Sequence, residues 1–248
     1  MSKAAPFALS ALLLAATAQA DFTAANIQFL LANDLSSDHP PFAKPDNPAP
    51  MFTLEVANGW KYGDNFFFTD IEQGPQYDKD KSIATYGELH SRLSMGKITG
   101  ADLSAGIFGD VLVAGEIDFP SGFQPTYLYG VGTDWKIPGA AFFMVNFFVR
   151  DEVATKGVSF QVNPAWLFPF AFGPVKGSFG GWMDFMTGEG DDQEMWWQMQ
   201  PTLMVDVGNF WGAPGKLETG IEYEYFKDFL GVKDWVKNKP QFVLKWNL

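Results

Sequence analysis

The stretch GWKYGDNFFFTDIE, residues 59–72, places three consecutive phenylalanines between acidic side chains. In a helix these acids would scatter around the circumference, and a soluble core strand would not bury them. In an extended strand successive side chains point to opposite faces. One face then carries Asp64, Phe66, Phe68, Asp70 and Glu72, and the other carries Asn65, Phe67, Thr69 and Ile71. The stretch therefore predicts a strand whose two faces meet different surroundings.

The composition of the whole chain points the same way. Aromatic residues make up 17% of the 248 residues, yet the mean hydropathy is only −0.06. This combination indicates apolar residues interleaved with polar ones, as in strands with two unlike faces. The formal charge of −12 argues against nucleic-acid binding, which needs a basic surface. The absence of cysteine excludes disulfides and cysteine-based metal sites.

The N-terminus has the pattern of a secretory signal. A short basic start at Met1 to Lys3 precedes the apolar run PFALSALLLAATA and the small residues AQA before Asp21. We therefore expect a signal peptide at residues 1–20 and one domain at residues 21–248. No later run is long enough for a membrane-spanning helix.

Alternation with a period of two recurs along the chain, separated by turn-forming residues. In the last segment Phe242, Leu244, Trp246 and Leu248 point one way, and the residues between them, Gln241, Val243, Lys245 and Asn247, point the other. Strands are expected at 22–31, 50–58, 64–72, 82–95, 103–117, 123–135, 140–150, 157–168, 175–187, 195–207, 216–229 and 239–248. About ten residues cross a bilayer as a tilted strand. The fold class predicted is all-β: a transmembrane antiparallel up-and-down β-barrel of about 12 strands with a narrow polar lumen.

The connections alternate between two kinds, as such a barrel requires. GWKYGD, SMGKITGAD, KIPG, PFAFGP and GNFWGAPG are compact and predicted to be periplasmic, whereas HPPFAKPDNPAP, QGPQYDKDK and EGDDQE are predicted to be extracellular. Aromatic residues near strand ends are expected to form interfacial girdles: Trp60, Tyr62, Trp135, Trp166, Trp211 and Trp235. A soluble β-sandwich or a soluble barrel also alternates, but neither would carry bulky aromatic residues on one face and charges in the middle of so many strands on the other.

Charged residues facing the bilayer midplane cost about 2–4 kcal/mol each, so the polar faces should line the lumen. The candidate solute-binding residues are Glu55, Phe66, Phe68, Asp70, Tyr86, Glu88, His90, Arg92, Arg150, Trp182, Asp184, Glu222, Glu224 and Lys245. Further inward positions are Asp64, Glu72, Asp110, Glu116, Asp134, Asn146, Gln161, Lys176 and Gln198. Inward aromatic rings alternating with hydrogen-bonding groups suit a planar, polar, uncharged solute, and the many acids disfavour anions. Alternatively, the charged pairs merely hold a plugged barrel in register.

Several segments resemble a known family. GWKYGDNFFFTDIE, YGELHSRLS, YLYGVGTDW, GIEYEYF and KPQFVLKW are similar to the nucleoside-specific channel-forming outer-membrane family (Tsx-like). The resemblance implies a twelve-stranded monomeric barrel in the bacterial outer membrane, whose narrow lumen passes nucleosides. Its surroundings would be membrane lipid and lipopolysaccharide.

Three other functions stay open from the sequence. An outer-membrane lipid hydrolase would need a Ser–His pair, but Ser91 points away from the face of His90, and Ser94 is too distant along the strand. EGDDQE (189–194) could hold Ca²⁺ but lacks the EF-hand spacing, so it is expected to be a solvated loop. A barrel sealed by large inward residues would be a structural protein or adhesin. We expect no catalytic residues, no metal and no cofactor.

Overall fold

The computed structural model describes residues 20–32, 49–73, 83–188 and 193–248. Within these ranges no helix is long and apolar enough to cross a membrane. The predicted signal peptide lies almost wholly outside the described residues, as do residues 33–48, 74–82 and the first four residues of EGDDQE.

Strands make up most of the described chain. The first seven are β1 (Ala20–Ala32), β2 (Ala49–Trp60), β3 (Gly63–Gln73), β4 (Ile83–Ser94), β5 (Phe108–Asp118), β6 (Thr126–Trp135) and β7 (Phe142–Glu152). The others are β8 (Ser159–Phe172), β9 (Val175–Met186), β10 (Trp196–Met199), β11 (Thr202–Asp206), β12 (Leu217–Lys227) and β13 (Val236–Asn247). The short helices are α2 (Met95–Thr99), η1 (Gly208–Trp211) and η2 (Phe229–Gly231).

Sequential antiparallel pairing closes these strands into a barrel. β13 pairs with both β12 and β1, so the sheet has no free edge. β10 and β11 both lie between β9 and β12, and together they form one strand that is interrupted at Pro201, which has no N–H to donate. The barrel thus has the twelve strand positions that the sequence predicts.

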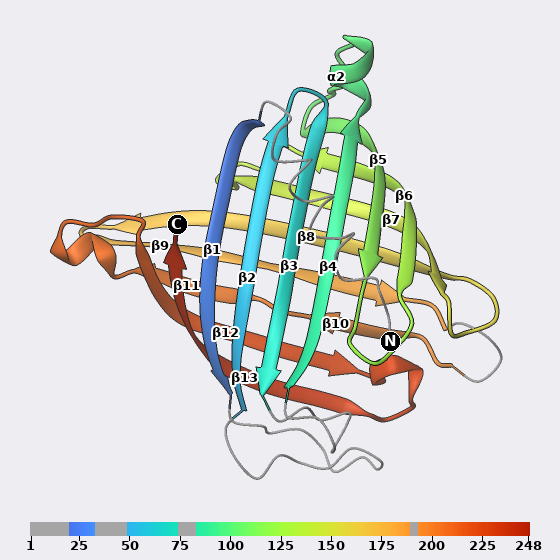
Figure 1. The fold of residues 1–248 in the computed structure, drawn as a ribbon. Coiled ribbons are helices and arrows are strands. Elements are labelled where there is room, and N and C mark those ends of the chain that lie inside the picture. Colours follow the sequence, from blue (N-terminus) through green and yellow to red (C-terminus); the bar gives the residue numbers. More distant parts are fainter. Residues whose placement is uncertain (1–19, 33–48, 74–82, 189–192) are drawn as a thin grey trace.

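The strands tilt strongly around the barrel. β1 to β4 run nearly upright in Figure 1, whereas β9 and β12 on the other side run nearly level. Strands tilted by about 35–45° to the barrel axis cross at a steep angle when seen through the barrel.

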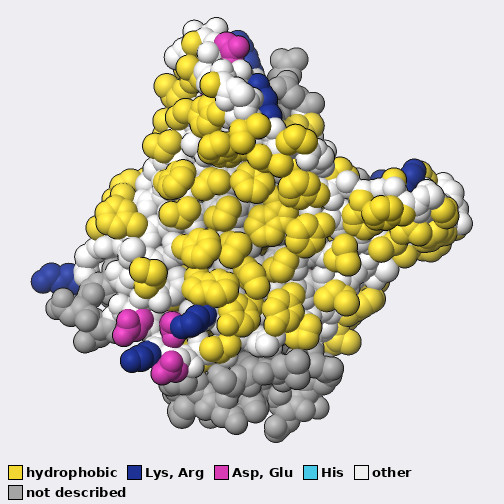
Figure 2. Space-filling view, turned by 180° about the vertical axis from the view of Figure 1, so that it is seen from behind, with side chains coloured by type: hydrophobic (Ala, Val, Ile, Leu, Met, Phe, Trp, Pro, Cys, Tyr) yellow, Lys and Arg dark blue, Asp and Glu magenta, His cyan; other side chains and the backbone are white. Residues whose placement is uncertain are grey.

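The two faces of the wall differ as predicted. Phe242, Leu244, Trp246 and Leu248 are all exposed on the outer face of the C-terminal segment. Figure 2 shows hydrophobic side chains covering one side of the barrel, with charged side chains gathered toward its ends. Buried polar residues, including Asn146, Gln161 and Asp184, lie on the opposite parity and face the lumen. The apolar belt is the surface that a bilayer would cover.

The connections at one end, here called the compact-turn end, correspond to the predicted compact set. The chain reverses at Lys61-Tyr62 between β2 and β3, and the rings of Trp60 and Tyr62 meet edge to face at 5.7 Å. At the other end, called the long-connection end, β1 and β3 end and β2 and β4 begin. N-terminal Ala20 and C-terminal Asn247 both belong to strand ends at the compact-turn end.

Most strand boundaries differ from the prediction by up to three residues, and two differ by more. The expected strand at 103–117 begins only at Phe108, because α2 and an extended segment precede it. Ser94 caps α2 by accepting a hydrogen bond from the Lys97 N–H, and Gly100 ends it with a positive φ of 72°. The expected strand at 157–168 continues to Phe172, so the turn is reduced to Gly173-Pro174.

An apolar cluster fills part of the long-connection end. Met186, Trp196 and Phe226 point inward from β9, β10 and β12, and Phe229 and Trp235 reach them from the 228–235 connection. Trp235 is only 6% exposed, so its predicted place in an interfacial girdle is wrong. It packs edge to face on Phe229 at 4.8 Å because the connection folds into the barrel. Trp211, in contrast, is 60% exposed at the compact-turn end.

Candidate functional site: the lumen wall

All fourteen predicted solute-binding residues lie on the lumen-facing parity of their strands. Strand register confirms this arrangement on β2, β3 and β4, where Glu55 is paired with Phe68, which is paired in turn with Glu88. Similarly, Asp70 is paired with Tyr86, and Phe66 with His90. Phe67 lies on the other face, stacked on Phe119 at 6.1 Å. The prediction that the two faces of residues 64–72 point to opposite sides of the wall is therefore confirmed.

An aromatic and acidic cluster occupies the inner wall of β3 and β4. The ring of Phe66 lies 6.0 Å from Phe68 and 5.6 Å from His90, and Phe68 lies 5.9 Å from Tyr86. The Tyr86 hydroxyl donates to Glu88 Oε1 at 2.5 Å. These rings stay partly exposed, Tyr86 by 36%, so they are open to a solute inside the lumen.

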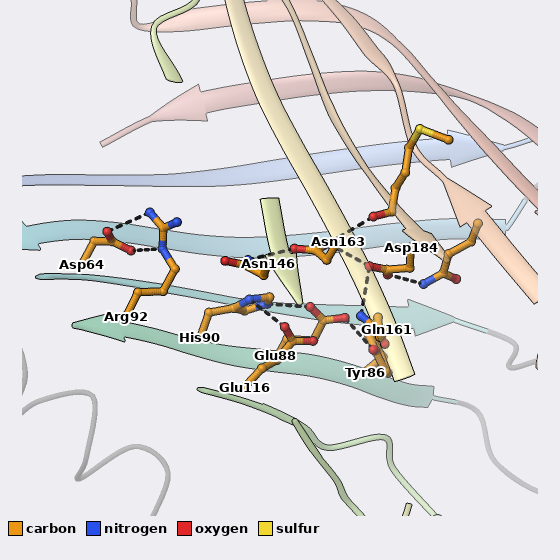
Figure 3. Close-up of polar contacts among 12 residues, drawn as sticks. Asp64, Tyr86, Glu88, His90, Arg92, Glu116, Asn146, Gln161, Asn163 and Asp184 are labelled. Atoms are coloured by element: carbon orange, nitrogen blue, oxygen red, sulfur yellow. Dashed lines mark hydrogen bonds and ion pairs between the residues drawn. The ribbon is translucent and has the colours of Figure 1, made fainter. Parts of the chain in front are cut away.

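A row of amides lies beside this cluster in the lumen (Figure 3). Asn146 donates to Asn163 Oδ1 at 3.1 Å, and Asn163 donates to Asp184 Oδ1 at 2.8 Å. Gln161 and Gln198 donate to the two oxygens of Asp184 at 3.0 and 2.9 Å. Asp184 thus accepts from three amides, two on β8 and one on β10, and its side chain has a fixed position.

Asn163 reaches Asp184 through a break in the ladder. β8 and β9 pair at Val162 with Phe185 and again at Ala165 with Trp182, with no pair between. Pro164 supplies no N–H at this point, and Asn163 Nδ2 donates to the Met183 carbonyl instead at 3.2 Å. The missing N–H of Pro164 therefore explains why the Asn163 side chain, and not the backbone, donates a hydrogen bond to β9 here.

Ion pairs join side chains of different strands near the compact-turn end. Arg92 donates through Nε and a terminal nitrogen to the two oxygens of Asp64, both at 2.8 Å, and through its other terminal nitrogen to Asp134 at 2.9 Å. This is the fork geometry that favours arginine over lysine. Lys245 lies 3.7 Å from Glu218, at the edge of a cavity of about 440 Å³ lined in part by Lys176 and Asp206. The residues that line this cavity lie near the compact-turn ends of β8, β9, β11 and β12, so the cavity is not at the centre of the barrel.

Two lysines of β13 form ion pairs with glutamates near the long-connection end. Lys237 donates to Glu224 Oε1 at 2.9 Å, and Lys239 lies 3.9 Å from Glu224 and 3.7 Å from Glu72. Lys239 thus links β12 with β3 although two strands separate β13 from β3 in the sheet. Glu222 accepts from Gln241 at 3.1 Å, and Arg150 pairs with Glu152.

The predicted site residues consequently form separate groups. The β3–β4 residues from Phe66 to His90 form one cluster, with Asp184 in the amide row near it. Asp70 accepts from Thr53 at 2.5 Å, and Glu55 accepts from Asn26 and Gln28. Arg92 and Lys245 lie toward the compact-turn end, and Arg150 and Glu224 toward the other. Trp182 is partly buried on the inner parity, beside Asp184 along β9.

Sequence reasoning missed several lumen residues: Asn26, Thr53, Asp118, Asn163, Lys237 and Lys239. Parity could have found most of them. Asp118 continues the alternation of Asp110 and Glu116 beyond the predicted end of the strand, and Lys237 and Lys239 extend β13 before Pro240. The partner relations of Asn163 depend on the ladder break, which no local pattern reveals.

A closed antiparallel barrel with an apolar outer belt and a polar lumen defines a transmembrane channel of the outer-membrane type. The family model described as nucleoside-specific channel-forming protein, Tsx, matches residues 25–246, and the chain belongs to this family. It is therefore a bacterial outer-membrane channel for nucleosides.

Other known proteins show little similarity to the chain. No curated protein matches the chain. Among solved structures, the outer membrane protein opdK from Pseudomonas aeruginosa is 10% identical, with a TM-score of 0.28 over 91% of this chain and 98% of that one.

Proposed function

We propose that nucleosides diffuse passively through this lumen and are selected by the aromatic cluster of β3 and β4. The observation that carries the proposal is the continuous row of Phe66, Phe68 and Tyr86, with ring centroids about 6 Å apart along the inner wall. A base passing over such a row can move from one ring to the next. Stacking on aromatic side chains contributes about 1–3 kcal/mol per base and tolerates different bases.

Hydrogen-bonding groups next to the rings complete the proposed path. Glu88 is half-buried and offers carboxylate oxygens that can accept from ribose hydroxyls and base amino groups, and the half-buried Gln198 offers an amide. Acids outnumber cations along this wall, which favours neutral nucleosides over phosphorylated ones. The same electrostatic argument assigns the lower flux to nucleotides.

No covalent chemistry belongs to this proposal. Both ring nitrogens of His90 face carboxylates, Glu88 at 2.7 Å and Glu116 at 3.0 Å, rather than a serine. Ser91 donates to Asn65 on the other face of the wall. These contacts support a channel over a lipid hydrolase.

The proposed arrangement in the membrane is a monomer with the compact-turn end in the periplasm. Closure of β13 onto β1 leaves no strand edge that would need a second copy. The long-connection end would then face the lipopolysaccharide leaflet, as is usual for bacterial barrels.

Planar-bilayer recordings test the solute path. We expect adenosine to block the ion current of the wild-type channel, and Phe68→Ala and Tyr86→Ala each to raise the blocking concentration about tenfold, the equivalent of about 1.4 kcal/mol. Phe67→Ala is the matched control, because Phe67 directly precedes Phe68 in the chain but faces outward. Equal block in all three variants would remove the aromatic row from the path.

Proteoliposome swelling tests selectivity separately. Uptake of nucleosides should exceed uptake of sugars of similar size. Equal rates would indicate a general pore, and no uptake of either would indicate a closed structural barrel.

A further inference from the structure

The connections at the compact-turn end are basic, although the chain as a whole is acidic. Five connections meet there, and four of them contain one exposed lysine each: Lys61, Lys97, Lys136 and Lys216. Asp102 is the one acid in the same five connections. The formal charge of the whole chain is −12, so the rim formed by these connections has the opposite sign to the rest of the molecule.

The four lysines form no ion pair with a carboxylate in the part of the chain that the structure describes. Lys61 Nζ lies over the ring of its neighbour Tyr62, 4.7 Å from the centroid. Lys216 Nζ donates to a carbonyl oxygen of β13 at 3.4 Å. Lys136 acts on Asp102 only at a longer distance. Their positive charges are therefore available to an anionic partner outside the protein.

The same rim exposes large apolar side chains on two opposite sides of the barrel. In the β4–β5 connection α2 buries no residue, and Ile98 and Ile107 are 47% and 54% exposed. In the β11–β12 connection Phe210 and Trp211 are 55% and 60% exposed. Six of the twelve strand positions, from β5 to β11, separate the two connections in either direction around the barrel. Figure 1 shows α2 projecting at the top and the orange β11–β12 connection projecting at the left.

Hydrogen bonds fix the β4–β5 connection while its apolar side chains remain uncovered. Asp110 on β5 accepts from the Gly96 N–H at 3.2 Å, and the Lys136 N–H donates to the Ile107 carbonyl at 2.7 Å. Because polar contacts hold the backbone in place, Ile98 and Ile107 do not fold back onto the barrel. Exposed apolar side chains on an ordered segment mark a surface that something else covers.

The outer belt continues onto these apolar side chains. Figure 2 shows hydrophobic side chains extending from the belt onto the projection at the top, which contains α2, and onto the projection at the right. An aromatic pair lies at the base of the α2 projection, where Phe108 meets Trp135 edge to face at 5.4 Å. A bilayer surrounds the barrel and covers opposite sides at once, whereas one docked protein covers one side. The two projections therefore fit lipid better than a protein partner.

We propose that the compact-turn rim binds the anionic headgroups of a phospholipid leaflet and inserts its apolar side chains at the boundary between headgroups and acyl chains. The lysine ammonium groups pair with lipid phosphates, while the lysine stems and the neighbouring apolar side chains lie in the apolar layer. Each lysine near a leaflet contributes about a fivefold preference for anionic lipid. Binding on opposite sides fixes the height and tilt of the barrel, whichever solute passes through it.

Spin labels test where the rim lies. The chain has no cysteine, so one introduced cysteine carries the only label. In vesicles of phosphatidylcholine and phosphatidylglycerol, we expect labels at Ile98→Cys and Phe210→Cys to be more accessible to oxygen than to a water-soluble nickel chelate. Lys176→Cys is the matched control and should favour the chelate, because Lys176 is exposed at the same end but lines a cavity on the inner parity. Equal behaviour at all three positions would place the rim in water and overturn the proposal.

Lipid quenching tests the lysines. Bimane attached at Ile98→Cys should be quenched more by brominated phosphatidylglycerol than by brominated phosphatidylcholine at the same mole fraction. Lys97→Gln combined with Lys136→Gln should lower this preference at least about fivefold. Lys216→Gln, on the opposite side, is the matched control: it should leave quenching at position 98 unchanged and lower it for bimane at Phe210→Cys.

Two results would contradict the role of the lysines. These are equal quenching by the two lipids when all four lysines are present, and equal effects of the lysine substitutions on both sides of the barrel. Circular dichroism of each variant verifies that the barrel has formed. Adenosine block is recorded for the same variants and should not change, so failure of the lipid surface and failure of the nucleoside path are separate results.

Discussion

Arg92 shows how single residues set the inner wall. Its guanidinium uses three nitrogens on Asp64 and Asp134, and its side chain is only 11% exposed, whereas the two acids are 32% and 41% exposed. The arginine is thus desolvated while its partners still contact water. A desolvated cation without a partner would be costly, and the paired hydrogen bonds from the guanidinium to the carboxylate of Asp64 compensate its charge.

Replacing Arg92 tests this balance. Arg92→Lys keeps the charge but loses the fork, so we expect the free energy of unfolding to fall by about 1–2 kcal/mol, with the partial exposure of the acids limiting the loss. Urea titration of tryptophan fluorescence in lipid vesicles measures the change. Lys176→Leu at the same end, where Lys176 is exposed, should change it by less than about 0.5 kcal/mol. Equal effects of the two substitutions would contradict the structural role of the fork.

The same interactions act at the scale of whole elements, and the 228–235 connection is the clearest case. Asp228, Leu230 and Asp234 all have positive φ values, between 52° and 64°, which non-glycine residues rarely adopt. Phe229 compensates for this by stacking on Phe226 at 4.5 Å and by meeting Trp235 edge to face at 4.8 Å inside the barrel. The connection therefore closes part of the lumen with apolar side chains.

Truncating Phe229 should loosen this closure. Phe229→Ala removes a buried ring, and we expect a loss of about 3–5 kcal/mol in unfolding free energy together with a larger single-channel conductance. Leu230→Ala is the control, because Leu230 is the next residue and is 41% exposed. A conductance that does not change in Phe229→Ala would show that the narrowest part of the lumen lies elsewhere.

How far the sequence predicts these elements depends on whether their cause is local. All twelve strands were predictable because lipid outside and a polar lumen inside impose the same alternation on each of them. α2 was missed because MGKIT offers too few residues for a helical period, so only its caps signal it. The extension of β8 to Phe172 was missed because Pro169 and the aromatic run FPFAF obscure the alternation.

Partner relations across the lumen were beyond prediction for another reason. Lys239 approaches Glu72, and Glu116 approaches Asp118 and His90, only after register and tilt have placed the strands. A sequence shows which residues face inward, but the stagger of the closed barrel decides which of them meet. The candidate solute path was therefore predictable as a list of residues and not as a geometry.

At the scale of the whole molecule, the barrel separates two environments by parity alone. On β6, Leu128 is 2% exposed and faces the lumen, whereas Tyr129 and Val131 are 53% and 47% exposed on the outer belt. Every strand repeats this division, so the stability of the barrel depends on the bilayer that covers the belt. A charge introduced on the belt should accordingly cost more at mid-strand than at a strand end.

Val131→Arg provides the test of this whole-molecule arrangement. Val131 lies at the middle of β6. An arginine there should destabilise the barrel folded in phospholipid vesicles by about 2–4 kcal/mol. Phe172→Arg is the matched control, since Phe172 is also an exposed apolar residue but borders the Gly173-Pro174 turn at the compact-turn end, and it should cost about 0–1 kcal/mol. The difference should disappear in urea titrations performed in detergent micelles, because a micelle deforms around the charge more readily than a bilayer does. Similar costs at the two positions in vesicles would mean that the bilayer midplane does not cross the middle of β6.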